Sequence, residues 1–127
     1  MHPHAQPTHS VLVVDDDHAI REMLTEALED AGYHVMSAEN GAQALTQLRQ
    51  VLTLPRVILL DLMMPVMTGW EFRVAQQANA RLAAIPVVVL SARPSMQHEA
   101  FTMTVEEFMQ KPVDITRLLT VVDRYCA

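Results

Sequence analysis

Three short segments of the sequence are apolar at every position, and each stops at a polar residue. The segments span 11–14, 57–60 and 87–90, and the residues that follow them are Asp15, Asp61 and Ser91. A strand with one face in water alternates apolar and polar residues, whereas a strand covered on both faces is apolar throughout. The pattern therefore predicts parallel strands buried between two layers of helices.

Helix-like segments separate these strands. The segment 19–31 has apolar side chains at the spacing of an amphipathic helix, and Asp17 is placed to cap its start. Further helices are expected after Asn40, over 70–81, near 95–103 and after Asp114, and shorter strands over 33–37 and 107–110. These βα units predict an α/β fold, a single doubly wound, flavodoxin-like sheet of five parallel strands in the order 2-1-3-4-5.

The length of 127 residues fits one domain, and 50% apolar content is enough for a core. Residues 1–10, with two prolines and three histidines, are expected to be a flexible N-terminal tail before a domain over 11–126. The longest apolar runs are too short to cross a bilayer, and the first residues do not have the pattern of a secretory signal. We therefore expect a cytoplasmic protein without a membrane segment.

The charged residues also exclude some functions. The formal net charge is −6, which disfavours direct nucleic-acid binding, because phosphate contacts need clustered Lys and Arg. Cys126 is the only cysteine, so an intramolecular disulfide is excluded. Lys111 is the only lysine, and it follows the predicted strand 107–110.

Acidic residues follow the first and third strands, which are neighbours in the predicted order. Ligands bind beyond the carboxyl ends of such strands, so Asp15, Asp16 and Asp61 should converge there. At about 5 Å and an effective dielectric of about 20, each carboxylate pair repels by roughly 3 kcal/mol, which a cation would offset. Oxygen ligands favour Mg²⁺, with Mn²⁺ as the alternative. A local role stays open, in which Asp15 and Asp16 only help to cap the next helix and Asp61 is structural.

Four segments in order resemble the motifs of response-regulator receiver domains. They span 11–17, 61–69, 87–92 and 108–112. The most specific of them is the pattern Asp-x-x-Met-Pro-x-Met-x-Gly at 61–69. The resemblance extends over about residues 11–126. It implies a two-component signalling module that receives a phosphoryl group from a histidine kinase or a histidine phosphotransfer protein. It also implies catalysis only of the domain's own phosphorylation and dephosphorylation, so the chain is not expected to be an enzyme.

The resemblance also implies roles for individual residues. By position, Asp61 corresponds to the phosphoacceptor. Mg²⁺ would be held by Asp16, Asp61 and the backbone carbonyl of Met63, with Asp15 acting through metal-bound water. Phosphoryl transfer depends on positioning and charge neutralisation, which such a site supplies.

Three further residues complete the implied site and switch. Ser91 corresponds to the hydroxyl that bonds a phosphoryl oxygen, and Lys111 to the lysine that pairs with the phosphate. Phe108 corresponds to the aromatic switch residue, which rotates into space that Ser91 vacates. The rotation would alter the face formed by helix four, strand five and helix five, where an output protein or a second copy would bind. The family also implies a cis peptide bond before Pro112.

The sequence departs from the family pattern near the output face. The stretch between Ala92 and Phe108 is shorter than usual by about two residues, and Thr104-Val105 stands where Gly-Ala is usual. A shortened or disordered helix four is therefore expected. Met63 offers no amide or acid to orient a water, and Arg93 is placed to cover a phosphate. These two residues lead to the hypothesis of a phosphoform that hydrolyses slowly.

Two other functions remain open at this point. One is a small Mg²⁺-dependent phosphohydrolase with an aspartyl-phosphate intermediate, which typically needs a second acid soon after the nucleophile; Met63 stands there instead. The other is a degenerate receiver that binds partners without phosphate, although all the expected polar positions are filled.

Overall fold

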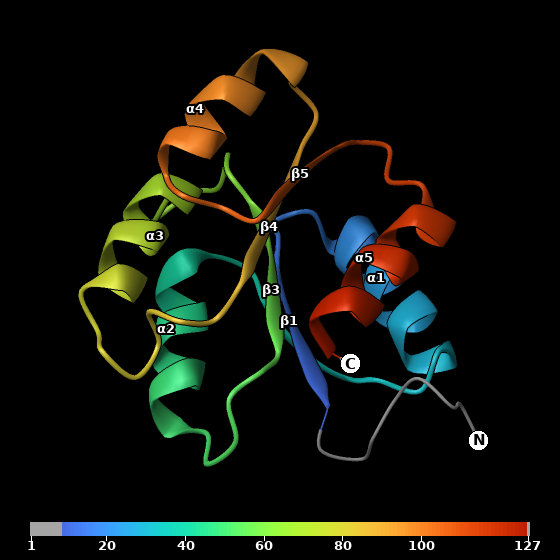
Figure 1. The fold of residues 1–127 in the computed structure, drawn as a ribbon, viewed down its shortest axis with the longest axis horizontal. Helices are drawn as coiled ribbons and strands as arrows, with labels where there is room; N and C mark the ends of the chain where they lie inside the picture. Colours follow the sequence, from blue (N-terminus) through green and yellow to red (C-terminus); the bar gives the residue numbers. More distant parts are fainter. Residues whose placement is uncertain (1–8, 127) are drawn as a thin grey trace.

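The computed structural model describes residues 9–126, and residues 1–8 of the predicted tail lie outside the described residues. Five parallel strands form one sheet in the order β2-β1-β3-β4-β5, which confirms the predicted fold class (Figure 1). The strands are β1 (Ser10–Val14), β2 (His34–Ala38), β3 (Val57–Asp61), β4 (Val87–Ser91) and β5 (Glu107–Gln110). β1 begins at Ser10, one residue before the predicted start of the domain.

Helices connect the strands and cover the sheet. They are α1 (His18–Asp30), α2 (Gly41–Gln50), α3 (Gly69–Gln77), α4 (Gln97–Thr102) and α5 (Ile115–Cys126), with a 3₁₀ turn, η1 (Pro94–Met96), before α4. Asp17 and Asn40 cap α1 and α2 as predicted, by accepting the backbone amides of Ile20 and Gln43. In residues 9–126, none of the helices is long and apolar enough to span a membrane.

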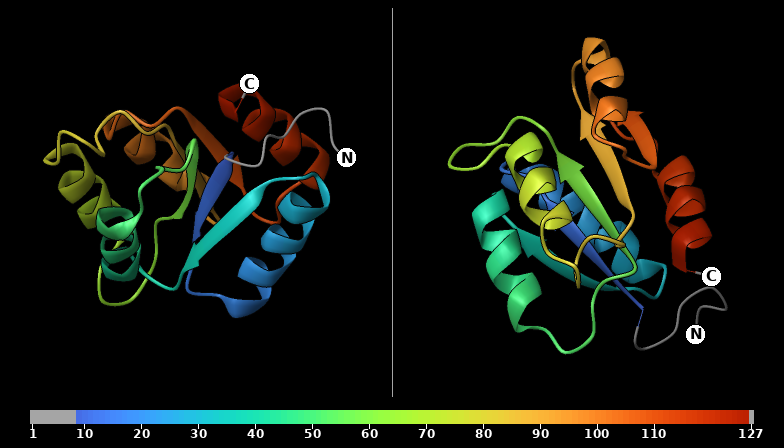
Figure 2. Two further views of the ribbon diagram at one scale, coloured as in Figure 1. Left: turned by 90° about the horizontal axis from the view of Figure 1, so that it is seen from below. Right: turned by 60° about the vertical axis from the view of Figure 1, so that its left-hand side comes forward.

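The sheet lies between two helix layers, with α1 and α5 on one face and α2, α3 and α4 on the other (Figures 1 and 2). Alternate side chains of β1 pack on opposite faces of the sheet. Leu12 and Val14 pack in the cluster that contains Phe72 of α3, and Val11 and Val13 pack in the cluster of α1 and α5. Every residue of β3 and β4 is buried, which explains why these segments are apolar without alternation.

The strand register brings the predicted site residues to one edge of the sheet. Val14 is paired with Leu60, so the residues that follow β1 lie beside Asp61 at the end of β3. Ser91 ends β4 opposite Gln110, and Lys111 comes next in the chain. Residues far apart in sequence are therefore gathered at the carboxyl ends of β1, β3, β4 and β5.

Two helices differ from simple expectation. The prediction of a helix as far as residue 81 was wrong, because α3 ends at Gln77. Asn79 explains the early end, since its side chain accepts the amide of Arg81 at 3.0 Å and so competes with the helix for this donor. The expected shortening of helix four is confirmed, and Thr104, just beyond α4, has a positive φ of 59°.

Candidate functional site

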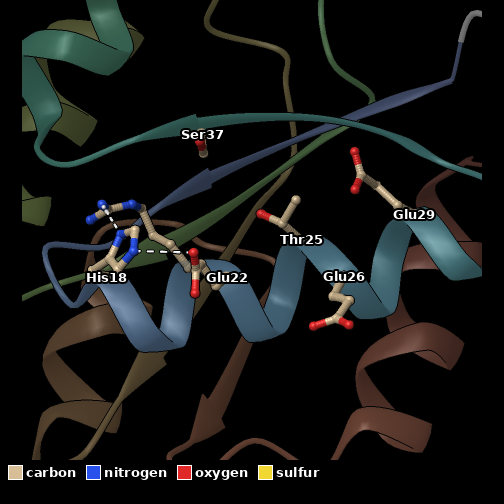
Figure 3. A pocket seen from close by; sticks show the side chains of 7 residues that line it. His18, Glu22, Thr25, Glu26, Glu29 and Ser37 are labelled. Atoms are coloured by element: carbon tan, nitrogen blue, oxygen red, sulfur yellow. Dashed lines mark hydrogen bonds and ion pairs between the residues drawn. The ribbon is translucent and has the colours of Figure 1, made fainter.

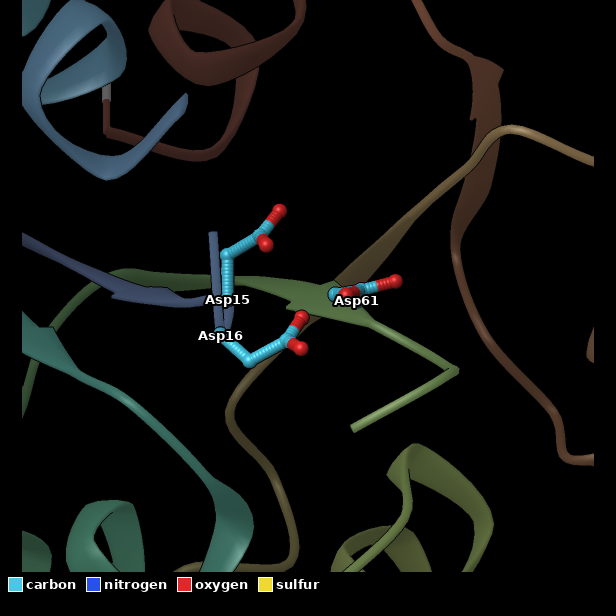
Figure 4. A group of neighbouring side chains, drawn as sticks. All are labelled: Asp15, Asp16 and Asp61. Atoms are coloured by element: carbon cyan, nitrogen blue, oxygen red, sulfur yellow. The ribbon is translucent and has the colours of Figure 1, made fainter. Parts of the chain in front are cut away.

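Three aspartates meet at the carboxyl edge of the sheet (Figure 4). Asp15 and Asp16 follow β1, Asp61 ends β3, and one oxygen from each lies within 4.8 Å of the others. Asp15 and Asp61 are only 1% and 6% exposed, whereas Asp16 is exposed to solvent. Two buried carboxylates at such a separation need compensating positive charge.

Helix capping does not account for this cluster. Asp17 is the N-cap of α1 and accepts the amide of Ile20 at 3.1 Å. Asp15 uses one oxygen, Oδ1, to accept the amide of Asp17 at 2.9 Å, which stabilises the turn before the helix. Its other oxygen, Oδ2, lies 2.7 Å from the Nζ of Lys111. The local role therefore applies to only half of this carboxylate.

Lys111 supplies part of the positive charge. Its Nζ lies 2.7 Å from Asp15 Oδ2 and 3.7 Å from Asp61 Oδ1, so the ammonium group bridges two of the three acids. The expected cis peptide bond between Lys111 and Pro112 is present. The predicted grouping of lysine and aspartates is thus seen directly in the geometry.

The lysine does not neutralise the cluster. Burial, the neighbouring Asp15 carboxylate and a hydrogen bond with Asp16 together raise the pKa of Asp61 from 3.8 to about 7. Lys111 and the Met63 amide, which donates to Asp61 Oδ1 at 3.3 Å, act in the opposite direction. The arrangement still lacks positive charge, and its carboxylate oxygens are the donors that a hard divalent cation prefers. The residues present therefore fit Mg²⁺.

A cavity of about 400 Å³ opens above these acids. The predicted site residues that line it are Asp15, Asp16, Asp61, Met63, Ser91 and Lys111, together with Arg93 at its exposed rim. Ser91 is buried, and its hydroxyl accepts the amide of Arg93 at 3.1 Å. Phe108 does not line the cavity; it is buried in the core with Phe72.

The loop after β3 is packed tightly against the end of that strand. The amide of Gly69 donates to the Leu62 carbonyl at 2.9 Å and so folds the loop back on itself. A Cβ at position 69 would lie 2.8 Å from the Asp61 carbonyl oxygen and from Leu62 Cα. Only glycine fits this approach without a backbone shift.

Comparison with known proteins identifies the family. Residues 11–123 match the family described as the response regulator receiver domain. This chain belongs to that family. The Vibrio cholerae chemotaxis protein CheY4 has 33% sequence identity to this receiver domain and a TM-score of 0.83, with 92% of this chain and 98% of that chain covered. A putative response regulator from Chloroflexus aurantiacus has 27% identity and a TM-score of 0.85, with 93% and 97% covered.

Several of the curated relatives are longer proteins. The receiver domain is 33% identical over 111 residues to the DNA-binding dual master transcriptional regulator RpaA of Synechocystis, covering 86% of this chain and 45% of RpaA. It is 34% identical over 111 residues to the response regulator MprA of Mycobacterium sp. strain KMS, covering 86% of this chain and 46% of MprA. The chain thus spans about half the length of these relatives.

A second hollow, of about 450 Å³, runs along α1 beside β2 (Figure 3). Glu22, Glu26 and Glu29 line it, and Glu22 Oε1 lies 3.1 Å from His18 Nε2. All three glutamates are exposed, so water solvates their charges. The receiver's buried aspartates differ from this group because water does not reach them freely.

Sequence reasoning missed two buried polar residues outside the aspartate site. Arg73 and Gln76 lie on the inward face of α3, beside Phe72. Their spacing from Gly69 and Phe72 repeats the helical period, so a helical projection would have placed both side chains in the core. Polar residues at core positions were the signal that could have identified them.

Proposed function

We propose that Asp61 of this receiver domain accepts a phosphoryl group with the assistance of Mg²⁺. The observation that carries the proposal is the position of Asp61 between a lysine and two further acids on the wall of an open cavity. Although Asp61 is largely buried and lies 3.7 Å from Lys111, it also borders a space in which a phosphodonor can approach.

Asp16, Asp61 and the backbone carbonyl of Met63 would hold the metal ion, and Asp15 would act through metal-bound water. Bound there, Mg²⁺ would neutralise charge on the acids and on the transferring phosphoryl group. The exposed position of Asp16 and the buried position of Asp15 agree with this division of roles. Mn²⁺, with the same preference for oxygen ligands, is the alternative ion.

The chemical step forms one bond and breaks one. A carboxylate oxygen of Asp61 forms a bond to phosphorus, and the bond between phosphorus and the donor breaks. A phosphohistidine donor on a histidine kinase or phosphotransfer protein then leaves as its imidazole. Lys111 pairs with the phosphoryl oxygens, and Ser91 donates a hydrogen bond from its hydroxyl. Ionised Asp61 is the nucleophile, and both Lys111 and the cation favour that form.

The phosphoryl group then biases a conformational equilibrium. Movement of Ser91 toward the phosphate would vacate space for Phe108, whose ring is buried in the core beneath α4. The result would be a changed surface over α4, β5 and α5, read by an output protein or by a second copy of the chain. The curated relative RpaA is described as DNA-binding, but we infer no direct nucleic-acid contact for this acidic domain.

Intact mass measurement tests the proposal. The protein is incubated with acetyl phosphate, a small phosphodonor, with Mg²⁺ or with EDTA. One added phosphoryl group is expected with Mg²⁺, and its absence is expected in Asp61→Asn. Asp30→Asn, an exposed aspartate at the end of α1, is the matched control and should behave as wild type. A phosphoryl group that persists in Asp61→Asn would place the acceptor elsewhere.

The same preparation separates the phosphohydrolase alternative. A receiver reacts with one donor molecule and cannot react again until its aspartyl phosphate is hydrolysed. A phosphohydrolase turns over many phosphoester molecules. Release of nitrophenol from nitrophenyl phosphate is followed for wild type and for Asp61→Asn. Sustained turnover that depends on Asp61 would favour the enzyme over the signalling module.

A further inference from the structure

Arg73 is a charged residue inside the core. Its side chain is 4% exposed on the inward face of α3. Its Nε donates to the Met103 carbonyl at 3.1 Å, and its Nη2 donates to the Thr104 carbonyl at 2.7 Å. Met103 is the C-cap of α4, and Thr104 is the next residue, so both carbonyls lie just past the last hydrogen bonds of the helix. The buried guanidinium thus acts on α4 and the segment that follows it.

Thr104 has a backbone conformation that its side chain disfavours. Its φ of 59° is in the left-handed region, which is unfavourable for a β-branched residue. Such conformations persist when surrounding contacts determine them. The Thr104 amide donates to the Phe101 carbonyl at 3.1 Å, and the Thr104 carbonyl accepts from Arg73. Arg73 therefore contacts the backbone at the strained residue itself.

Gln76 holds the guanidinium from the other side. Its Oε1 accepts from Arg73 Nη1 at 2.8 Å, and its Nε2 donates to the carbonyls of Leu82 and Ile85, each at 3.0 Å. Gln76 is fully buried, so these bonds form away from water. The network fixes Arg73 between the α3–β4 loop and the α4–β5 segment.

The α4–β5 segment leads directly to the proposed switch residue. Val105, which follows Thr104, is buried in the same core cluster as Phe108. The Glu106 amide donates to the Val87 carbonyl at 2.9 Å, and the Glu106 side chain accepts the Val87 amide at 2.8 Å. The backbone of Thr104 therefore sets where these side chains enter the core.

We propose that Arg73 is a positioning residue that holds Thr104 in its left-handed conformation and thereby fixes the α4–β5 segment ahead of Phe108. The arginine and the strained threonine form one unit. Replacing the threonine by glycine, which adopts this conformation without penalty, should make the arginine less necessary. That the segment must move when the domain signals rests on the proposed function.

The test is a double-mutant cycle with Arg73→Met, Thr104→Gly and the double variant, on the full chain without phosphodonor. Hydrogen exchange at the amides of Thr104 and Glu106 is the readout, since both amides are hydrogen-bonded. The matched control is Arg81→Met, because Arg81 also donates to backbone carbonyls, those of Leu48 and Val51, far from this segment in sequence.

Arg73→Met should speed exchange at both amides by about tenfold or more. Arg73→Lys should not restore protection, because an ammonium group cannot reproduce the planar fork of guanidinium. Arg81→Met should leave these amides unchanged. In the Thr104→Gly background the effect of Arg73→Met should fall by at least about threefold.

Independent effects of the two substitutions would overturn the proposal, as would equal exchange in Arg73→Met and Arg81→Met. If Arg73→Met does not fold, the double variant decides. Recovery of folding by Thr104→Gly supports the coupling, and failure of the double variant to fold refutes it, because the arginine would then support the core without regard to Thr104.

A second measurement addresses signalling. Wild type and Thr104→Gly are treated with acetyl phosphate and Mg²⁺, uptake is confirmed by mass, and exchange at Thr104 is compared with the untreated proteins. A change on phosphorylation that is larger in wild type than in Thr104→Gly supports release of the strained unit; equal changes contradict it. If wild type takes up no phosphoryl group, the proposed function fails while the double-mutant cycle still decides the role of Arg73.

Discussion

Replacing Asp61 with asparagine should stabilise the metal-free protein at pH 8. The wild-type carboxylate is buried and ionised at that pH, close to Asp15 and Asp16. Asparagine has nearly the same shape but no charge, so the variant loses the repulsion while keeping the packing. Residues that serve a ligand are often costly to the fold, and the substitution measures that cost directly.

The magnitude follows from the distances. With up to 4.8 Å between carboxylate oxygens and an effective dielectric of about 20, each of the two acids repels Asp61 by about 3.5 kcal/mol. Lys111, at 3.7 Å, offsets about 4.5 kcal/mol of this repulsion. The pKa of Asp61, raised from 3.8 to about 7, corresponds to at most about 4 kcal/mol. We expect a gain of about 2 kcal/mol in the free energy of unfolding, because the asparagine amide must itself be desolvated.

The gain depends on pH with a definite sign. The folded pKa of Asp61 lies above its unfolded value, so the folded state binds more protons than the unfolded state between about pH 4 and pH 7. Wild-type stability should therefore fall as the pH rises through this window, and Asp61→Asn should lack that contribution. The two proteins should differ little at pH 4 and most at pH 8.

Urea denaturation in EDTA, followed by circular dichroism, measures the difference. A gain of this size moves the midpoint upward by about 1 M. Asp30→Asn is the control and should change stability by less than about 0.5 kcal/mol. Added Mg²⁺ should raise the wild-type midpoint and affect Asp61→Asn much less. Equal wild-type and Asp61→Asn midpoints at pH 8 would refute the reasoning, since Lys111 would then fully neutralise the acids.

Three further substitutions test other parts of the site. Gly69→Ala places a Cβ 2.8 Å from the Asp61 carbonyl and should cost about 1–3 kcal/mol in urea denaturation, with slower phosphoryl uptake by mass; unchanged stability would mean the loop shifts freely. Lys111→Met leaves Asp15 buried beside no cation and should cost about 3 kcal/mol at pH 7 by the same assay. Arg93→Ala should shorten the lifetime of the phosphoform, followed by mass measurement over time. An unaltered lifetime would show that Arg93 does not shield the phosphoryl group from water.

The sheet and the aspartate cluster were predictable because their signals are short-range. Burial on both faces explains why the first four residues of β3 and of β4 are apolar, and a carboxylate directly after such a run is unusual without a partner. The strand order then places Asp15, Asp16 and Asp61 together. Once the fold was predicted, the meeting of these acids required no further information.

The end of α3 and the role of Arg73 were not predictable in the same way. The helix ends where the Asn79 side chain takes the Arg81 amide, a local competition that hydrophobic periodicity does not record. The partners of Arg73 are the backbone carbonyls of Met103 and Thr104, about thirty residues away. Every residue has such a carbonyl, so the residue types at 103 and 104 do not indicate this contact. Such contacts depend on the final approach of two helices.

The pair between Asp15 and Lys111 joins residues that are 96 positions apart. During synthesis, Asp15 leaves the ribosome long before Lys111. A nascent chain that stops before residue 111 therefore contains Asp15 and Asp61 but lacks the lysine that pairs with them. On the proposed function, phosphoryl uptake should therefore begin only when Lys111, which follows β5, joins the aspartates.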